Sequence, residues 1–192
     1  MIKNFRIDYL EVHGVKNKSE GGAVTEQTRF QAASISKSVA AMAALKFVLD
    51  GKITLDENIN AALLSWQVPE NNFTENEKVT LERLLRHTAG TTVSGFPGYR
   101  ADAPLPTLLQ VLNGEAPANT SPIVVDMVPG RSFRYSGGGY CIVQQALIDM
   151  EQKDFPRIMK TSVLNPLGMK HSTYEQPLLP VYGRHRKTWP CF

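Results

Sequence analysis

A serine and a lysine, Ser34 and Lys37, stand three positions apart where the most apolar stretch of the chain begins. Residues three apart share one face of an α-helix, so we expect the Lys37 amine to reach the Ser34 hydroxyl. A helix N-terminus presents free N–H groups and the positive end of the helix dipole, which favour a developing oxyanion and disfavour a second positive charge. The pattern therefore predicts a serine nucleophile beside a neutral, proton-accepting lysine.

The Ser-x-x-Lys spacing is weak evidence by itself, because about one such match is expected by chance in a chain of this length. The structural alternative is a serine that caps the helix N-terminus, followed by a solvated lysine in the first turn. A second element has to decide between these two interpretations.

That second element is Tyr135, at the tip of a glycine-rich turn that leads through Gly137, Gly138 and Gly139 into an apolar helix. Glycines at such a turn let the backbone approach a neighbouring group closely. A tyrosine hydroxyl near a lysine amine can accept or relay a proton, since each group stabilises the proton-accepting form of the other. The alternative is an aromatic side chain that only packs on a tight turn.

The composition is typical of a globular protein. The chain has 192 residues, 42% of them hydrophobic, which suits one domain or one and a half with a packed core. The formal charge of +3 and the lack of a long basic run in the body of the chain give no reason to expect nucleic acid as a partner. No apolar stretch approaches the ~18 residues of a membrane span, and the N-terminus lacks a signal-peptide core, so we expect a cytoplasmic location for the chain as written.

Short elements have to position the candidate residues. We predict a strand over 5–15, a turn over 16–22, a buried helix that contains Val39 to Leu49 and stops at Gly51, and short helices over 59–64, 81–86, 108–112, 140–150 and 155–164. Segments 94–106 and 113–122 are rich in Gly, Pro, Ala and Asn, which indicates long surface loops. Cys141 and Cys191 have no metal-ligand spacing, and we expect Cys141 to be a buried free thiol.

Five segments, in this order, resemble the serine β-lactamase-related family, which contains class C β-lactamases, penicillin-binding-protein-like D-alanyl-D-alanine carboxypeptidases and carboxylesterases. They are Phe30–Ser38, Asp50–Asp56, Leu84–Gly90, Pro129–Ser136 and Asn165–Met169, and the resemblance covers roughly residues 7 to 178. It implies an α+β fold of the β-lactamase/transpeptidase type, in which an antiparallel sheet packs against a helical region and the active site lies between them. Here the helical region would be present with a remnant of the sheet.

By this resemblance Ser34 is the nucleophile, Lys37 its activating partner and Tyr135 a further general base and acid, while Ser136 and Gly137 contact the substrate. The implied reaction is acyl transfer from a β-lactam, a D-alanyl peptide or an ester through a serine acyl-enzyme, with the Ser34 N–H as one oxyanion donor. No metal or organic cofactor is implied. No pattern indicates an oligomeric state.

Histidines are expected to take no direct part. His87 suggests a Ser–His pair, but it lies in a segment that in the family is a structural motif at a helix end. We expect His13, His171 and His185 to be surface or packing residues, because they show no ligand spacing.

The chain also departs from the family pattern. Gly137 stands where the family often has Asn, so Ser136 or a backbone group would have to substitute for that side chain. The family's third motif, Lys or His followed by Thr or Ser and then Gly, is absent, and we treat Lys187-Thr188 as coincidence because it lacks a strand pattern. We expect a partial domain over 1–178, apparently truncated at both ends, and a non-native or disordered tail over 179–192. The alternative function is therefore a catalytically inactive fragment or pseudoenzyme.

Overall fold

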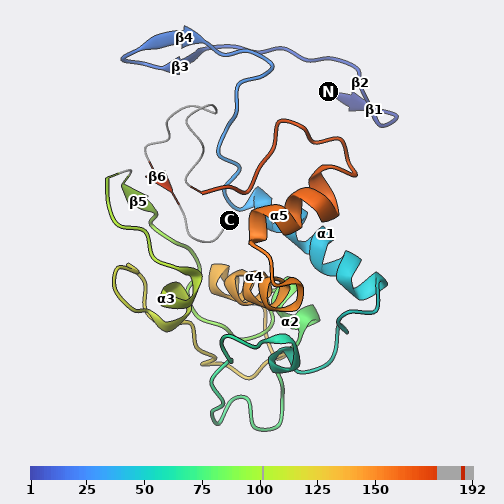
Figure 1. Ribbon diagram of the computed structural model, residues 1–192, viewed down its shortest axis with the longest axis vertical. Helices are drawn as coiled ribbons and strands as arrows, with labels where there is room; N and C mark the ends of the chain where they lie inside the picture. The colour runs from blue at the N-terminus through green and yellow to red at the C-terminus, as the bar shows by residue number, and fades with distance from the viewer. Residues whose placement is uncertain (101, 177–186, 189–192) are drawn as a thin grey trace. The chain divides into compact units, whose positions relative to one another are not determined.

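The computed structural model describes residues 1–100, 102–176 and 187–188, and it divides the chain into one unit over Met1–Gln31 and a second that begins at Ala32 (Figure 1). The second unit contains the helices: α1 (Ile35–Leu49), the 3₁₀ helix η1 (Ile59–Ala62), α2 (Leu81–Leu85), α3 (Leu108–Asn113), α4 (Gly137–Glu151), α5 (Phe155–Met159) and the π-helical η2 (Lys160–Leu164). Helices predicted at all of these places are thus confirmed.

The first unit consists of two short antiparallel hairpins. Strand β1 (Ile2–Lys3) pairs with β2 (Arg6–Ile7), and β3 (Val15–Asn17) pairs with β4 (Gly21–Ala23). The prediction of one strand over 5–15 is wrong, because Phe5 and Gly14 have left-handed φ angles of 58° and 90°, which an extended strand does not allow. The predicted turn lies between β3 and β4.

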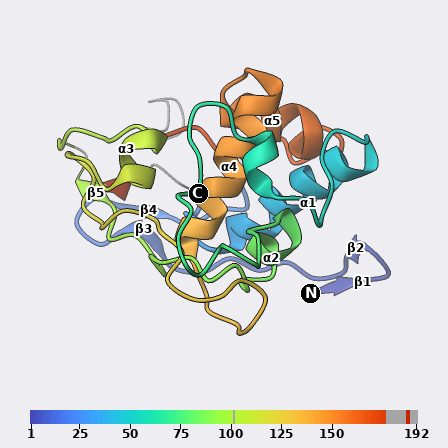
Figure 2. The same ribbon diagram turned by 90° about the horizontal axis from the view of Figure 1, so that it is seen from below.

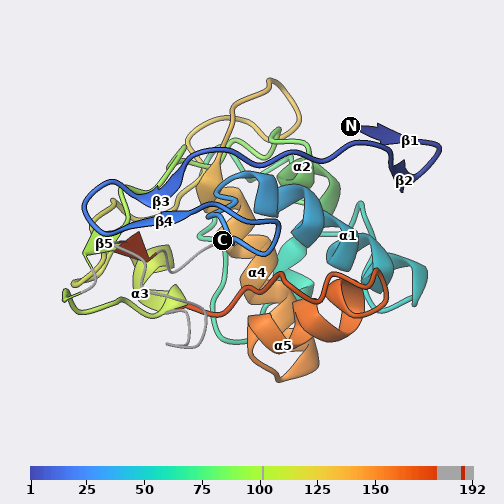
Figure 3. The same ribbon diagram turned by 90° about the horizontal axis from the view of Figure 1, so that it is seen from above.

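Helix α4 lies at the centre of the second unit, where it contacts α1, α2, α3, α5 and η1 (Figures 1, 2 and 3). It begins three residues before the predicted start because Ser136 caps it, accepting the Gly139 N–H at 2.9 Å. Cys141 on this helix is fully buried, but it is disulfide-bonded, so the expected free thiol is wrong.

Glycines let the first turn of α4 touch the backbone of residues 92–94. The Gly137 N–H donates to the Ser94 carbonyl at 3.1 Å, and the Gly138 N–H donates to the Val93 carbonyl at 2.9 Å. A Cβ atom on Gly138 would lie 2.7 Å from the Thr92 carbonyl oxygen. The glycine run is therefore required by backbone packing, as the sequence predicted.

Helix α1 packs on α4, α5 and η2 through one face, which includes Ala40, Ala44 and Phe47. Four of its other apolar residues are exposed: Ile35, Met42, Leu45 and Leu49. The expectation of a helix buried all round is therefore wrong. The predicted stop at Gly51 is confirmed: its φ is +68°, and the following N–H of residue 52 donates to the Phe47 carbonyl.

A two-residue strand near the end of the chain corrects the expectation that Lys187-Thr188 does not form a strand. Strand β6 (Lys187–Thr188) pairs antiparallel with β5 (Tyr99–Arg100), within one of the predicted loops. The other residues of 179–192 lie outside the described residues. Within the described ranges we find no helix with the length and apolarity that crossing a bilayer requires.

Candidate active site

Ser34 stands at the start of α1 and does not cap it. Its backbone is helical, with φ −66° and ψ −11°, and its side chain makes no capping hydrogen bond. The preceding Ala33 has a left-handed φ of 45°, so the chain turns sharply just before the serine. The capping interpretation is therefore excluded, and the hydroxyl is available for other contacts.

Lys37 and Tyr135 both contact the Ser34 hydroxyl. The Lys37 ammonium donates to Ser34 Oγ at 3.3 Å, and the Tyr135 hydroxyl donates to the same oxygen at 2.8 Å. Lys37 Nζ also lies 5.4 Å from the Tyr135 ring centroid and 5.8 Å from that of Tyr140, within the range of cation–π attraction. The structure thus brings together the three residues predicted to react.

The two tyrosines near Lys37 differ in acidity. Burial raises the pKa of Tyr135, but its hydrogen bonds to Ser34 and Lys37 and the charge of Lys37 lower it, and the net pKa is below the ordinary 10.0. Burial, and then the charge of Tyr135, raise the pKa of Tyr140, whose hydroxyl donates to the Leu85 carbonyl at 3.2 Å. Neighbouring groups whose pKa values move apart take different roles, and here Tyr135 is the group suited to exchange a proton.

The loop that contains Tyr135 is held by the turn His87–Gly90. The Arg134 N–H donates to the His87 carbonyl at 2.8 Å, and the Gly130 N–H donates to the Thr88 carbonyl at 2.7 Å. The Arg134 guanidinium donates to the Gly90 carbonyl at 2.6 Å and forms an ion pair with Asp126. These bonds explain why a segment 40 to 50 residues earlier in the chain determines where Tyr135 lies.

Tyr174 fixes the other side of the site. Its hydroxyl donates to the Ser36 carbonyl in the first turn of α1 at 2.6 Å, and its ring meets the edge of Phe155 at 5.4 Å. Burial raises the pKa of Tyr174, so the hydroxyl remains a donor. The sequence analysis missed this residue, because it follows the last recognised segment and stands in no motif.

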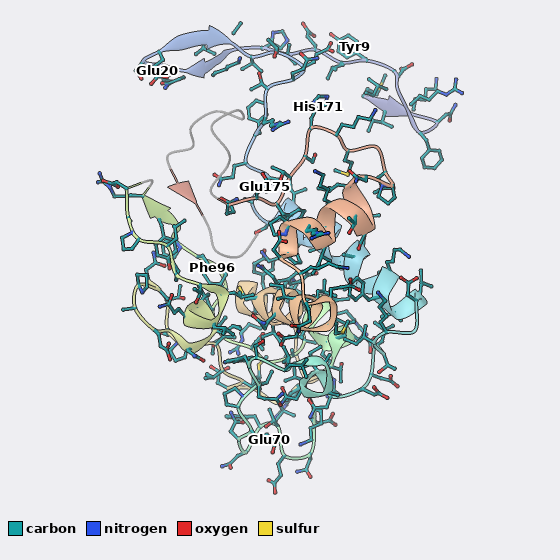
Figure 4. All side chains as sticks on the ribbon, in the orientation of Figure 1. Tyr9, Glu20, Glu70, Phe96, His171 and Glu175 are labelled. Carbon is teal, nitrogen blue, oxygen red and sulfur yellow. The ribbon has the colours of Figure 1, made fainter. Side chains whose placement is uncertain are left out.

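Ser136 and Gly137 lie beside Tyr135, but both are engaged in the fold. The Ser136 hydroxyl donates to the Thr92 carbonyl at 2.7 Å and is 1% exposed. A Cβ atom on Gly137 would lie 3.0 Å from the ring of Phe96, which Figure 4 labels. A contact between these residues and substrate remains a prediction.

The histidines lie in different environments. His87 is partly buried and accepts the Ser136 N–H on its Nδ1 atom at 3.2 Å, whereas His13 and His171 are exposed. His185 lies outside the described residues. In the part of the chain that is described, no group of three or more His, Cys, Asp or Glu side chains could hold a metal ion.

Comparison with known proteins decides the family. The Beta-lactamase family model matches residues 2–188. The chain belongs to this family. The expected resemblance is therefore confirmed, and the match continues ten residues past the boundary at 178 that the sequence suggested.

Two curated proteins show how distant the relatives are. Protein flp of Staphylococcus aureus (strain N315) is 22% identical over 179 residues, which cover 92% of this chain and 34% of flp. Esterase EstB of Burkholderia gladioli is 30% identical over 90 residues, which cover 47% of this chain and 23% of EstB. The β-lactamase-family chain described here thus spans about a third of the length of flp.

Solved structures show the same fold. A penicillin-binding protein from Bacillus halodurans has a TM-score of 0.66 and 23% identity over 88% of this chain and 50% of its own. A β-lactamase/D-alanine carboxypeptidase from Yersinia pestis has a TM-score of 0.65 and 22% identity over 82% of this chain and 43% of its own. The expected α+β fold of the β-lactamase/transpeptidase type is confirmed.

Proposed function

We propose that this β-lactamase-family chain provides the nucleophilic half of a serine acyl-transfer site. The observation that carries the proposal is the position of Ser34 Oγ, within hydrogen-bond distance of both Lys37 Nζ and the Tyr135 hydroxyl. A serine hydroxyl is a weak nucleophile until a neighbouring base takes its proton. Two groups that can hold a proton lie beside this serine.

The proton moves through these contacts. Tyr135 in its phenolate form accepts the Ser34 proton while Oγ bonds to the carbonyl carbon of the substrate, forming a tetrahedral intermediate. The intermediate collapses, the bond from that carbon to the leaving nitrogen or oxygen breaks, and Tyr135 returns the proton to the leaving group. Water then attacks the acyl-enzyme by the same route and releases the acid.

Lys37 supports this exchange by its charge, so the proposal departs from the neutral, proton-accepting lysine that the sequence predicted. An ammonium group near the ring and hydroxyl of Tyr135 stabilises the phenolate, which is the form that accepts the serine proton. The N–H of Ser34 forms no hydrogen bond within the described residues and would donate to the oxyanion as the tetrahedral intermediate forms.

The substrate class is a carbonyl compound with a good leaving group: a β-lactam, a D-alanyl peptide or an ester. This range follows from the family, because the relatives named above include a penicillin-binding protein, a D-alanine carboxypeptidase and an esterase. The alternative is a protein that keeps the fold and binds such compounds without turnover.

Covalent labelling tests the proposal. The folded chain is incubated with a fluorophosphonate and, separately, with a fluorescent penicillin, and the adduct is located by peptide mass spectrometry. We expect an adduct on Ser34 that is absent in Ser34→Ala and retained in Ser38→Ala, which changes an exposed serine one turn further along α1. A sample that melts cooperatively and yields no adduct on Ser34 would contradict the proposal. Adducts that form but never hydrolyse would favour the alternative.

A further inference from the structure

The residue His87 contacts the backbone on both sides of Tyr135. Its carbonyl oxygen accepts the Arg134 N–H at 2.8 Å, and its Nδ1 atom accepts the Ser136 N–H at 3.2 Å. The two amides that flank Tyr135 are therefore both bound by one residue. We infer that His87 is a positioning residue that holds the Tyr135 hydroxyl against Ser34, an inference that rests on the proposed acyl transfer.

The backbone of His87 is turned to make both contacts. Its φ is +59°, in the left-handed region that few residues other than glycine, asparagine and aspartate adopt without cost. Strained residues of this kind persist where the surrounding structure over-determines them, and they cluster at functional sites. Here the strain directs the carbonyl group and the imidazole toward the same loop.

The His87 ring also restricts the side chain of Tyr135. The two ring centroids are 4.5 Å apart with an angle of 38° between the planes, and the Tyr140 ring lies on His87 at 5.3 Å. Phe133 meets the imidazole edge-on at 6.0 Å. The phenol that faces Ser34 is thus packed against a ring that is itself held between aromatic neighbours.

Only the neutral imidazole can make the Ser136 contact, because a protonated Nδ1 has no lone pair to accept an N–H. The titratable groups that face the ring are Lys37 of α1, Tyr135 of the loop and Tyr140 of α4. Burial and the charge of Lys37 lower the pKa of His87 below 6.5. The bond is therefore intact at neutral pH, and it is lost as pH falls through the lowered pKa.

Two substitutions of His87 distinguish the role of its hydrogen-bond acceptor from the role of its aromatic ring. Both His87→Asn and His87→Gly tolerate the left-handed backbone and lack the imidazole, but only asparagine keeps an oxygen that can accept the Ser136 N–H. We expect the fluorophosphonate labelling rate of Ser34 to fall about 100-fold in His87→Gly and to recover at least about tenfold in His87→Asn, because small displacements of a reacting group have effects of this size. The exposed His171 (Figure 4) provides the control variant His171→Asn, which should label as the wild type does.

The pH dependence of Ser34 labelling is a second measurement, and a purely structural role of His87 would not change it. Wild-type labelling should decline in acid as His87 is protonated, and His87→Asn should lose this component of the decline. Equal rates and equal pH profiles for His87→Asn and His87→Gly, in samples that melt cooperatively, would overturn the inference.

Nuclear magnetic resonance separates this inference from the proposed function, because it needs no reaction. We expect ¹⁵N shifts at pH 7 to show His87 neutral with its proton on Nε2, and ¹³C shifts to show a higher Tyr135 pKa in His87→Gly than in the wild type, with Tyr135→Phe assigning the signal. If these shifts are observed and Ser34 is not labelled, the positioning role of His87 is supported and the acyl-transfer proposal is contradicted. If Ser34 is labelled and the His87 proton lies on Nδ1, the acyl-transfer proposal is supported and the positioning role is contradicted.

Discussion

The Tyr135 hydroxyl donates to Ser34 Oγ at 2.8 Å, although the two residues are 101 positions apart in the chain. Lys37 reaches the same oxygen from within α1 and is local to the serine. One half of the site is therefore encoded by helix periodicity and the other by tertiary packing. The two halves predict different responses to mutation.

Removing the hydroxyl group of Tyr135 or of Tyr140 tests whether the two tyrosines have different roles. Tyr135→Phe should lower the Ser34 labelling rate about 10² to 10⁴-fold, the usual contribution of a positioned acid or base. Tyr140→Phe should leave the rate within a few-fold and instead lower the free energy of unfolding by about 1 kcal/mol, because it removes the bond to the Leu85 carbonyl. Labelling kinetics and urea unfolding measure the two effects. A larger rate loss in Tyr140→Phe would reverse the assignment.

Lys37→Met should shift the pH dependence of labelling. The pKa of Tyr135 lies below 10.0 because the bonds to Ser34 and Lys37 and the charge of Lys37 outweigh burial. In the wild type the labelling rate should therefore rise with pH before the ordinary tyrosine range is reached. Without the ammonium group the rise should move upward, toward or above pH 10, and the rate at pH 8 should fall. An unchanged profile would show that Lys37 does not act on Tyr135.

Asp149 on α4 is expected to stabilise the fold in a pH-dependent way. This carboxylate is 2% exposed and accepts the N–H groups of Leu64 and Ser65 at 2.8 and 3.0 Å and the Ser65 hydroxyl at 2.5 Å. Burial raises its pKa, but these bonds and one from Gln145 lower it below 3.8. Its contribution is thus present above that value and lost as pH falls through the lowered pKa.

Asp149→Asn should accordingly cost about 1.5 to 3 kcal/mol of unfolding free energy at pH 7. The wild type and the variant should converge as pH falls below 3.8 and through the lowered pKa of Asp149. Urea unfolding across this range measures the difference, and a difference that stays constant with pH would contradict the role of the ionised group.

Gly138→Ala should destabilise the protein by about 1 to 3 kcal/mol, the usual cost of overpacking. The new methyl group would lie 2.7 Å from the Thr92 carbonyl oxygen, which is backbone and cannot swing aside. Gly95→Ala is the matched control, because a Cβ atom there meets nothing within 4 Å. Thermal melting of the two variants measures the difference in stability. Equal melting temperatures would show that the first turn of α4 is not tightly packed against the backbone of residues 92–94.

Local features of the site were predictable from the sequence. The i, i+3 spacing placed Lys37 beside Ser34, Thr80 marked the start of α2 by accepting the Arg83 N–H, and the glycines of α4 indicated close backbone packing. Each of these depends on residues within one turn or one cap, where side-chain chemistry determines the backbone.

Apart from Tyr135, which the family resemblance placed with Ser34, the long-range features were not predictable. Nothing in the pattern around Tyr174 indicates that its hydroxyl binds the Ser36 carbonyl, and nothing around His87 indicates that it binds both amides beside Tyr135. The pairing of β6 with β5 was missed for the same reason, since a two-residue strand has no periodicity to recognise. The apolar composition of α1 predicted a helix buried on all sides. The observed helix has one face that no neighbouring element covers, and apolar residues on that face are exposed.

The bond between Tyr174 and Ser36 joins residues 138 positions apart, and this has a consequence for the order of events on the ribosome. At synthesis rates of about 5 to 20 residues per second, roughly 7 to 28 s pass between the addition of the two residues. Throughout that interval the first turn of α1 lacks the hydrogen bond from Tyr174. A nascent chain thus completes this contact only when almost all of the described sequence has been made.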